Sequence, residues 1–310
     1  MTLTPPTLIL GTAQWGWNVP RDDAFRLLDA WLAAGFREID TATNYPINKQ
    51  AADFRAAEHI LCEYLDAHGI NDAQVTMKVG SLNNMRTPEI NLSPSFILMM
   101  ADEYRRLLGD NLRGLMLHWD NRDELQAIRA TLNALAICQE EFGLRPGLSG
   151  IARPDLYAAA NTELGLSFDI EIKHNIFHSD YERYSPFHRA QHRFLAYGIN
   201  AGGIKLEGPY PAASTLLARG GDPEKLAGQI ERLRALLPRL NTAFVRPPVL
   251  TMNHAGLIHA GLHPAIGGII LGVSTVAQLK ETLDFWRNLE AFEYEDVWKS
   301  LDAFRKEAQM

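Results

Sequence analysis

The sequence has few features of secreted, membrane-spanning or disulfide-stabilised proteins. It contains two cysteines in 310 residues, Cys62 and Cys138, and both fall in segments with helical periodicity, so no structural disulfide is expected. No apolar run approaches the roughly 18 to 20 residues that span a bilayer, and residues 1–6 lack the basic and apolar regions of a secretory signal. These absences predict a cytoplasmic protein with no membrane partner.

Positive charge is also scarce. The chain has 30 Lys and Arg residues against 37 Asp and Glu residues, which gives a formal net charge of −7. This balance disfavours nonspecific attraction to nucleic acid phosphates and to anionic lipids. A hydrophobic content of 46% is enough for a substantial core and excludes a disordered chain. We therefore expect small-molecule partners, no nucleic acid, and a monomer or a small homo-oligomer.

Eight short apolar runs recur along the chain with amphipathic segments between them. The runs cover residues 7–10, 36–39, 75–79, 114–117, 147–151, 168–172, 193–197 and 266–271. They lack the strict alternation of a sheet with one wet face, which is typical of parallel strands covered on both sides. The pattern predicts eight buried parallel strands.

Helical periodicity occupies most of the intervening sequence. The predicted helices cover residues 21–34, 52–67, 95–108, 122–141, 154–161, 223–236 and 276–290. Eight strands alternating with helices in about 270 residues predict an α/β fold of the (β/α)8 TIM barrel type, as a single domain over residues 1–310. Residues 175–191 fall outside the pattern, as either an active-site loop or a partly helical surface insertion.

Polar residues follow several of the predicted strands, where a barrel places its functional groups. Asp40 ends the second strand, Tyr45 follows five residues later, Lys78 lies in the third strand, and His118 ends the fourth. A phenol has an ordinary pKa of about 10, so proton transfer near neutral pH requires a nearby cation such as Lys78. A buried lysine in turn needs a carboxylate such as Asp40, and His118 could hydrogen-bond a carbonyl oxygen.

Each of these residues also has a structural interpretation when taken alone. Asp40 could cap the next loop, Tyr45 could anchor a loop through its hydroxyl, and His118 could be a core histidine. Lys78 differs, because an unpaired lysine in a buried strand is costly. Four such groups at successive strand ends favour a functional set.

Two segments carry a resemblance to a known family. Residues 11–16 (GTAQWG) and 39–45 (IDTATNY) resemble the first- and second-strand motifs of the aldo-keto reductase superfamily, with Lys78 and His118 in matching order. The resemblance implies that Asp40 supports Lys78, that Lys78 lowers the pKa of Tyr45, that Tyr45 is the general acid, and that His118 orients the carbonyl. Hydride would come from carbon 4 of NADP or NAD in its reduced form, with family usage favouring NADP.

The resemblance also implies a set of cofactor and substrate contacts. Residues 269–281 (IILGVSTVAQLKE) are similar to the family's adenosine-phosphate segment, and residues 196–203 (AYGINAGG) are similar to its pyrophosphate loop or form a plain glycine-rich turn. The expected cofactor contacts are Thr12, Asp40, Arg153, Glu171, Tyr197, Gly198, Asn200, Gly272, Ser274 and Gln278. Trp15 and Trp119 are candidates for the wall of an apolar or sugar-stacking substrate pocket, or for packing.

Several positions depart from the family pattern. The family holds the nicotinamide carboxamide with a Ser-Asn pair after strand five and a Gln on strand six, where we align Ala152, Arg153 and Glu171. Val273 replaces a basic residue that often holds the NADP 2′-phosphate, which makes NAD plausible. A glycine-rich Rossmann fingerprint does not follow the first strand, so a Rossmann domain is not expected.

Three functions fit these observations. The first is an NAD(P)-dependent reductase or dehydrogenase acting on an aldehyde, ketone or sugar, or on the corresponding alcohol. The second is a regulatory barrel that binds a nucleotide or ligand without efficient turnover, motivated by the altered carboxamide site. The third is a lyase, isomerase or metal-dependent hydrolase; we expect no metal, because no His-x-His motif follows strand one and no metal-spaced cluster is present.

Overall fold

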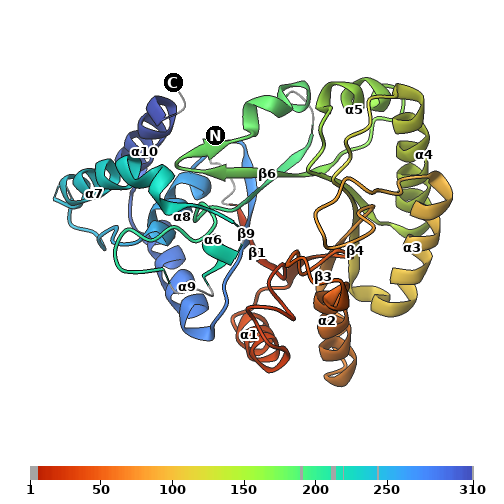
Figure 1. Cartoon of the computed structure of the whole chain (residues 1–310), viewed down its shortest axis with the longest axis horizontal. Helices are drawn as coiled ribbons and strands as arrows, with labels where there is room; N and C mark the ends of the chain where they lie inside the picture. Colours follow the sequence, from red (N-terminus) through yellow and green to blue (C-terminus); the bar gives the residue numbers. More distant parts are fainter. Residues whose placement is uncertain (1–5, 189–190, 211–213, 219, 243, 309–310) are drawn as a thin grey trace.

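Eight parallel strands close into a barrel with helices around it (Figure 1). The computed structural model describes residues 6–188, 191–210, 214–218, 220–242 and 244–308. The barrel strands are β1 (Thr7–Gly11), β2 (Glu38–Ala42), β3 (Gln74–Val79), β4 (Leu112–His118), β5 (Arg145–Ser149), β6 (Asp169–Asn175), β8 (Arg193–Tyr197) and β9 (Ile266–Leu271). Each pairs with its neighbours in chain order, β9 pairs with β1, and the pairing of β5 with β6 completes the circle. The predicted (β/α)8 barrel is confirmed.

The helices follow the strands in the order that a barrel requires. They are α1 (Arg21–Ala33), α2 (Ala56–Ala67), α3 (Pro94–Leu108), α4 (Leu125–Phe142), α5 (Pro154–Asn161), α6 (Thr215–Ala218), α7 (Ala227–Asn241), α8 (Met252–Gly261), α9 (Val276–Ala291) and α10 (Glu295–Ala308). Short 3₁₀ helices cover Ala51–Asp53, Gly109–Asn111, Tyr181–Phe187 and Pro223–Leu226. Across the described ranges, none of the helices combines the length and apolar content needed to cross a bilayer. The cysteines lie in α2 and α4 and are not bonded to each other.

Among the strands whose bounds differ from the apolar runs that predict them, β2 and β5 affect the placement of site residues. β2 begins and ends later than residues 36–39, because Ala42 at its end pairs in register with Lys78 of β3. β5 ends at Ser149 rather than at residue 151, and Ser149 pairs with both His118 and Glu171. These strand ends carry polar side chains, so hydrophobicity alone places them incorrectly.

Helix α8 is missing from the sequence prediction for a physical reason. Met252 and residues 254–260 are all buried, so the helix has no polar face and no amphipathic period. A Cβ on Gly256 would lie 2.6 Å from the carbonyl oxygen of Ile199, so this glycine lets the helix approach the loop after β8 closely. Helix α10 is also missing from the sequence prediction. In this case the signal is present in the sequence, because Val297, Leu301 and Phe304 are buried and recur at helical spacing.

The described part of residues 175–191 is a partly helical insertion. β7 (His178–Ser179) pairs antiparallel with β6, and the 3₁₀ helix Tyr181–Phe187 follows it. The hydroxyl of Tyr184 accepts a hydrogen bond from the backbone N–H of Ile151 at 3.2 Å, which fixes the insertion against the loop after β5. Of the two interpretations left open by the sequence, the structure shows the helical insertion.

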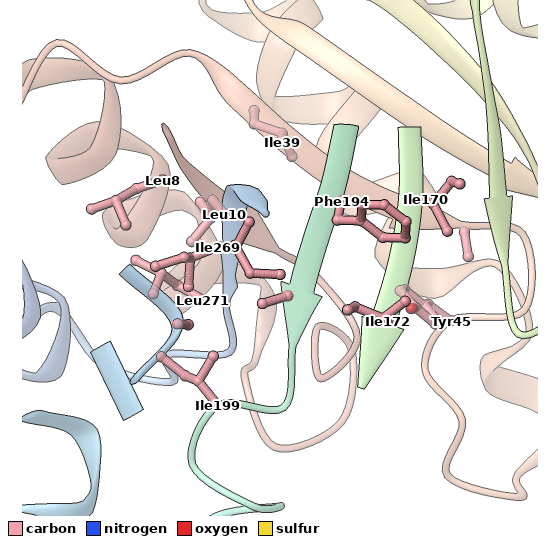
Figure 2. Close-up of a cluster of buried hydrophobic side chains, with 14 of the residues drawn as sticks. Leu8, Leu10, Ile39, Tyr45, Ile170, Ile172, Phe194, Ile199, Ile269 and Leu271 are labelled. Atoms are coloured by element: carbon pink, nitrogen blue, oxygen red, sulfur yellow. The ribbon is translucent and has the colours of Figure 1, made fainter. Parts of the chain in front are cut away.

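The barrel interior is filled by a small apolar cluster. It consists of Ile9, Met116, Leu195 and Ile270, from β1, β4, β8 and β9. The larger core lies between the strands and the helices, and Figure 2 shows part of it, with Leu8, Leu10, Ile170 and Ile172 on the alternate positions of β1 and β6. Successive residues of a strand face opposite sides, so residues two positions beyond the interior cluster also face the interior.

Three histidines pack together where α8 covers β6. The rings of His174 and His259 stack with centroids 4.5 Å apart, and His263 meets His174 edge-on at 5.0 Å. Burial lowers the pKa of His259 to about 3 and that of His263 to about 4, and holds that of His174 well below its ordinary value. These rings are therefore neutral in the folded protein at neutral pH.

Their burial makes the fold sensitive to acid. In the unfolded chain each histidine takes up a proton near pH 6.5, whereas in the fold His263 does not until about pH 4 and His259 until about pH 3. The unfolded state therefore binds more protons below pH 6.5, and the stability contributed by the neutral rings is lost as the pH falls toward 4.

We predict that His259→Gln reduces the acid-induced loss of stability. Between pH 7 and pH 4.5 the variant should lose about 2 kcal/mol less unfolding free energy than the wild type, because one depressed histidine pKa has been removed. Urea unfolding at a series of pH values measures this difference. His59→Gln, at an exposed position of α2, is the matched control and should follow the wild type. Parallel pH profiles for the wild type and His259→Gln would contradict the prediction.

Candidate active site

A cavity opens at the C-terminal ends of the barrel strands. This mouth cavity has a volume of about 320 Å³. Its polar lining residues include Gln14, Asp40, Tyr45, His118, Ser149, Glu171, Tyr197 and Asn200. His118 lies two positions beyond Met116 on β4, so the apolar interior cluster forms the floor of the cavity. The polar groups therefore lie above an apolar floor and are partly shielded from water.

Lys78, Asp40 and Glu171 form a buried ion cluster at the inner end of this cavity. The Lys78 ammonium donates to both carboxylate oxygens of Asp40, and it lies 3.1 Å from Oε1 of Glu171. The other oxygen of Glu171 accepts a hydrogen bond from Oγ of Ser149 at 2.8 Å. The three charged side chains are 1%, 5% and 4% exposed. Three strands, β2, β3 and β6, thus hold one ammonium in a fixed position.

The charges of the cluster shift one another's protonation. Burial alone would lower the pKa of Lys78, but the carboxylates of Asp40 and Glu171 outweigh burial and hold it well above its ordinary value. Burial and the charge of Glu171 raise the pKa of Asp40 well above its ordinary value, against the opposing effect of Lys78. The lysine therefore stays charged, while the two carboxylates compete for it.

Tyr45 places its ring over this cluster. Nζ of Lys78 lies 5.1 Å from the ring centroid, and the ring of His118 meets it edge-on at 5.9 Å. The backbone N–H of Tyr45 donates to the carbonyl of Ala42 at the end of β2, which ties the loop to the strand. The Tyr45–Pro46 peptide bond is cis. Burial raises the pKa of Tyr45 to about 12, although the charge of Lys78 lowers it. The phenol is therefore protonated at neutral pH.

His118 offers a neutral ring to the cavity. Burial, assisted by the charge of Lys78, lowers its pKa well below the ordinary value. Its Nδ1 has no hydrogen-bond partner among the described residues. The ring packs against Trp119, whose φ of 63° is unusual for a large residue, and a Cβ on Gly150 would collide with the indole at 2.5 Å. A glycine at 150 therefore lets Trp119 line the cavity.

A second, larger cavity adjoins the first. This outer groove has a volume of about 950 Å³, and it shares Gln14, Asn200, Gly203 and Gly272 with the mouth cavity. Nδ2 of Asn200 donates to Oδ1 of Asn253 at 3.2 Å, while Oδ1 of Asn200 is buried with no partner in the described structure. The two cavities therefore form one elongated site with an unused acceptor at the point where they meet.

The start of α9 lines the outer groove. Thr275 caps the helix by accepting from the N–H of Gln278, and Oε1 of Gln278 accepts from both the N–H and the hydroxyl of Ser274. Ser274 and Gln278 both line the groove. The turn that the sequence predicts to meet phosphate is thus formed and held by its own side chains.

Most of the site residues predicted from the sequence line these two cavities. Asp40, Tyr45, His118, Trp119, Glu171, Tyr197, Gly198, Asn200 and Gly272 line the mouth cavity, and Ser274 and Gln278 line the outer groove. Lys78 is buried directly behind Asp40 and Tyr45. Their roles in binding and catalysis remain predictions.

Three predicted site residues lie elsewhere. Trp15 is fully buried in the hydrophobic core, which corrects its placement in a substrate pocket. Arg153 precedes α5 and pairs with Asp155 at the surface, and it is not among the residues that line either cavity. Thr12 is buried behind the mouth cavity and donates to Oγ1 of Thr41 at 2.8 Å.

Sequence reasoning missed two polar residues of the mouth cavity. Ser149 is the last residue of β5 and bonds Glu171, but a strand predicted to end at 151 conceals it. Gln14 follows β1 and donates to the carbonyl of Gly272 at 3.3 Å, next to the shared wall of the two cavities. Functional residues of such barrels lie at the C-terminal ends of the strands. A prediction that ended β5 at residue 149 would therefore have made Ser149 a candidate site residue.

Comparisons with known proteins cover the same part of the chain. Residues 7–305, which include every barrel strand and both cavities, match the model of the Aldo/keto reductase family. An uncharacterized 11.2 kDa protein in the crtE 3′ region of Pseudescherichia vulneris is 36% identical over 78 residues, which cover 24% of this chain and 76% of that protein. The family match covers nearly the whole chain, and the cavity at the C-terminal ends of the strands agrees with it. The chain therefore belongs to the aldo/keto reductase family.

Proposed function

We propose that the protein interconverts a carbonyl group and the corresponding alcohol, with NAD(P) as hydride carrier and Tyr45 as general acid and base. One observation carries the proposal: the Tyr45 phenol lies over the Lys78–Asp40 pair and beside His118 in a partly enclosed cavity. Membership of the family supports an NAD(P)-dependent oxidoreductase. The substrate is a small aldehyde, ketone or sugar that enters the mouth cavity beside Trp119.

Each residue has a defined task in carbonyl reduction. A reduced nicotinamide bound in the mouth cavity would provide the hydride that the carbonyl carbon receives. As the C=O π bond breaks, Tyr45 donates its phenolic proton to the oxygen, which forms the alcohol and leaves a phenolate. Lys78 stabilises that phenolate through its charge, and Asp40 keeps Lys78 charged. Neutral His118 donates a hydrogen bond that orients the carbonyl oxygen.

The residues of the two cavities fit a dinucleotide. The elongated site joins an inner part with the catalytic groups to an outer part that ends at the helix start of α9. Ser274 and Gln278 would hold the adenosine-phosphate end, and Tyr197, Gly198 and Asn200 would hold the middle and the nicotinamide end. The unpartnered acceptor of Asn200 is one buried group that such a ligand would satisfy.

The charge of the outer groove favours NAD over NADP. Its described lining carries the carboxylates of Glu207 and Glu281 and one cation, Lys205. Val273 also lines this groove, at the position where the family resemblance implies a basic residue for a 2′-phosphate. A phosphate group carries up to two negative charges, so an acidic lining repels it. We infer that the groove accepts NAD with less repulsion than NADP.

A regulatory barrel without turnover is the alternative. It predicts nucleotide binding without hydride transfer, and Glu171 at the predicted carboxamide position motivates it. The contact of all four expected catalytic groups favours the enzyme, because a binding protein does not need a phenol beside a buried ammonium.

We predict that Tyr45→Phe lowers kcat by about 10² to 10⁴-fold, because the general acid is lost while the ring is retained. Nucleotide affinity should stay within about twofold, since the hydroxyl serves the substrate. Titration of NADH and NADPH by nicotinamide fluorescence, followed by a screen of aldehydes and aldoses, measures both quantities.

Tyr64→Phe is the matched control for this substitution. Its hydroxyl bonds Asp29 in the helical layer, outside the two cavities, so turnover should be retained. Absence of binding by either nucleotide to the wild type would overturn the proposed function. Full turnover by Tyr45→Phe would overturn the role of Tyr45.

The pKa of Tyr45 predicts opposite pH profiles for the two directions. The phenol is the acid in reduction and is protonated up to about pH 12, so kcat/KM for reduction should change little between pH 7 and 10. Alcohol oxidation needs the phenolate, so its kcat/KM should rise with pH by up to about tenfold per unit. Initial rates in both directions across this range test the assignment. A fall in reduction with flat oxidation would show that Tyr45 is already ionised.

We predict that Glu281→Lys raises the affinity for NADPH about fivefold relative to NADH, because it replaces a repelling charge with an attracting one at the groove. Glu290→Lys makes the same change of net charge on an exposed position of α9, about 13.5 Å further along the helix, and should leave the ratio unchanged. Dissociation constants for both nucleotides at low ionic strength give the ratio. Equal ratios in the two variants would contradict the prediction.

A further inference from the structure

The ion cluster has one more carboxylate than it has cationic side chains, and the raised pKa of Asp40 means that a proton can balance the difference. Two carboxylates, those of Asp40 and Glu171, face the single ammonium of Lys78, and all three side chains are 5% exposed or less. The described lining of the mouth cavity contains no lysine or arginine, and His118 is neutral. A buried carboxylate without a full partner is costly, so this end of the cavity favours an additional cation.

Glu171 is the carboxylate with the weaker partner. Asp40 accepts from the ammonium with both oxygens, whereas Glu171 receives it on one oxygen at 3.1 Å. The other oxygen of Glu171 accepts a neutral hydrogen bond from Ser149. Glu171 also lines the mouth cavity, next in register to Ser149 on the neighbouring strand. Glu171 is therefore the more weakly paired carboxylate of the two, and it faces the space in which the reacting groups meet.

We propose that Glu171 makes this cavity distinguish the two redox states of a nicotinamide, binding the oxidised ring more tightly than the reduced ring. This inference rests on the proposed function, because it requires a nicotinamide in the mouth cavity. The oxidised ring carries one positive charge and the reduced ring carries none, so a buried carboxylate attracts only the first. When both nucleotides are present, the site is therefore occupied mainly by the oxidised form, which is the form that accepts hydride from an alcohol.

Tyr45 responds to the same charge in a way that prepares the oxidised complex to react with an alcohol. The negative charges of Asp40 and Glu171 contribute to the high pKa of its phenol. A cation beside Glu171 opposes that contribution, so Tyr45 gives up its proton more readily while the oxidised ring is bound. Alcohol oxidation requires this phenolate as the base. Glu171 thus acts as a specificity-determining residue for redox state.

Proton binding provides a second signature of the cluster. The titratable and charged groups around Glu171 are Asp40, Tyr45, Lys78, His118, Tyr184 and Tyr197. Of these, Asp40 is the carboxyl that burial and Glu171 together push toward protonation. A cation at Glu171 reverses that effect, so binding of an oxidised nucleotide should release protons from the cluster. Binding of a reduced nucleotide should not.

The test compares the wild type with Glu171→Gln, which keeps the size of the side chain and removes its charge. Dissociation constants for NAD⁺ and NADH are measured by calorimetry, without turnover. Glu171→Gln should weaken NAD⁺ binding about tenfold and change NADH binding less than twofold. Glu171→Asp, which restores a carboxylate, should recover part of the preference.

Glu58→Gln is the matched control, because it neutralises another buried carboxylate that pairs with Arg55 and Tyr104 in the helical layer. It should leave both dissociation constants unchanged. An unchanged NAD⁺/NADH ratio in Glu171→Gln would overturn this inference and leave the proposed function intact. Failure of the wild type to bind either nucleotide would overturn both.

A measurement on the wild type alone covers the case in which Glu171→Gln does not fold. Calorimetry of NAD⁺ and NADH binding in two buffers of different ionisation enthalpy gives the number of protons released. We expect more protons to be released on binding of NAD⁺ than on binding of NADH. Equal release with both nucleotides would overturn the inference.

Discussion

The burial of one lysine ammonium between two carboxylates is the constraint on which the site depends. Lys78 comes from β3, Asp40 from β2 and Glu171 from β6, on the opposite side of the barrel from β2. An ammonium without water is tolerated only when its partners are held in place. Because the three groups lie on strands of one closed hydrogen-bonded circle, barrel closure itself fixes their distances. The rigidity of the barrel therefore holds the three charged groups at fixed positions in the site.

The alternation of the barrel strands separates the core from the chemistry. On β4, Met116 belongs to the apolar interior and His118 to the cavity, one pleat further on. The apolar layer below excludes water from the ion cluster, which strengthens every charge interaction there. The same burial outweighs the effect of Lys78 on Tyr45, so the phenol is an acid near neutral pH rather than a preformed base. The expectation that Lys78 sets this pKa describes the one cation that lowers it, whereas burial and the charges of Asp40 and Glu171 raise it.

The sequence predicts the barrel better than it predicts the site, and the reason is physical. Strands covered on both sides leave a strong apolar signal, and β8 and β9 match their predicted ranges. Polar strand ends leave no such signal, so the predicted end of β5 lies beyond Ser149 and conceals this residue, and Arg153 is assigned to a site that it does not line. Helix α8 is also not predicted, because it is buried on all sides and its sequence therefore has no amphipathic periodicity. A tryptophan such as Trp15 fits a pocket or a core equally well until the neighbouring helices are placed.

The excess of negative charge has different consequences in the two parts of the elongated site. In the outer groove, Glu207 and Glu281 can be screened by water and salt, so their effect on a 2′-phosphate weakens with ionic strength. Glu171 lies in a buried cluster, where salt screens little. A preference set by Glu171 should therefore persist at an ionic strength that removes the preference set by Glu281. The ionic-strength dependence of nucleotide binding separates the two causes, although both come from carboxylates in one continuous site.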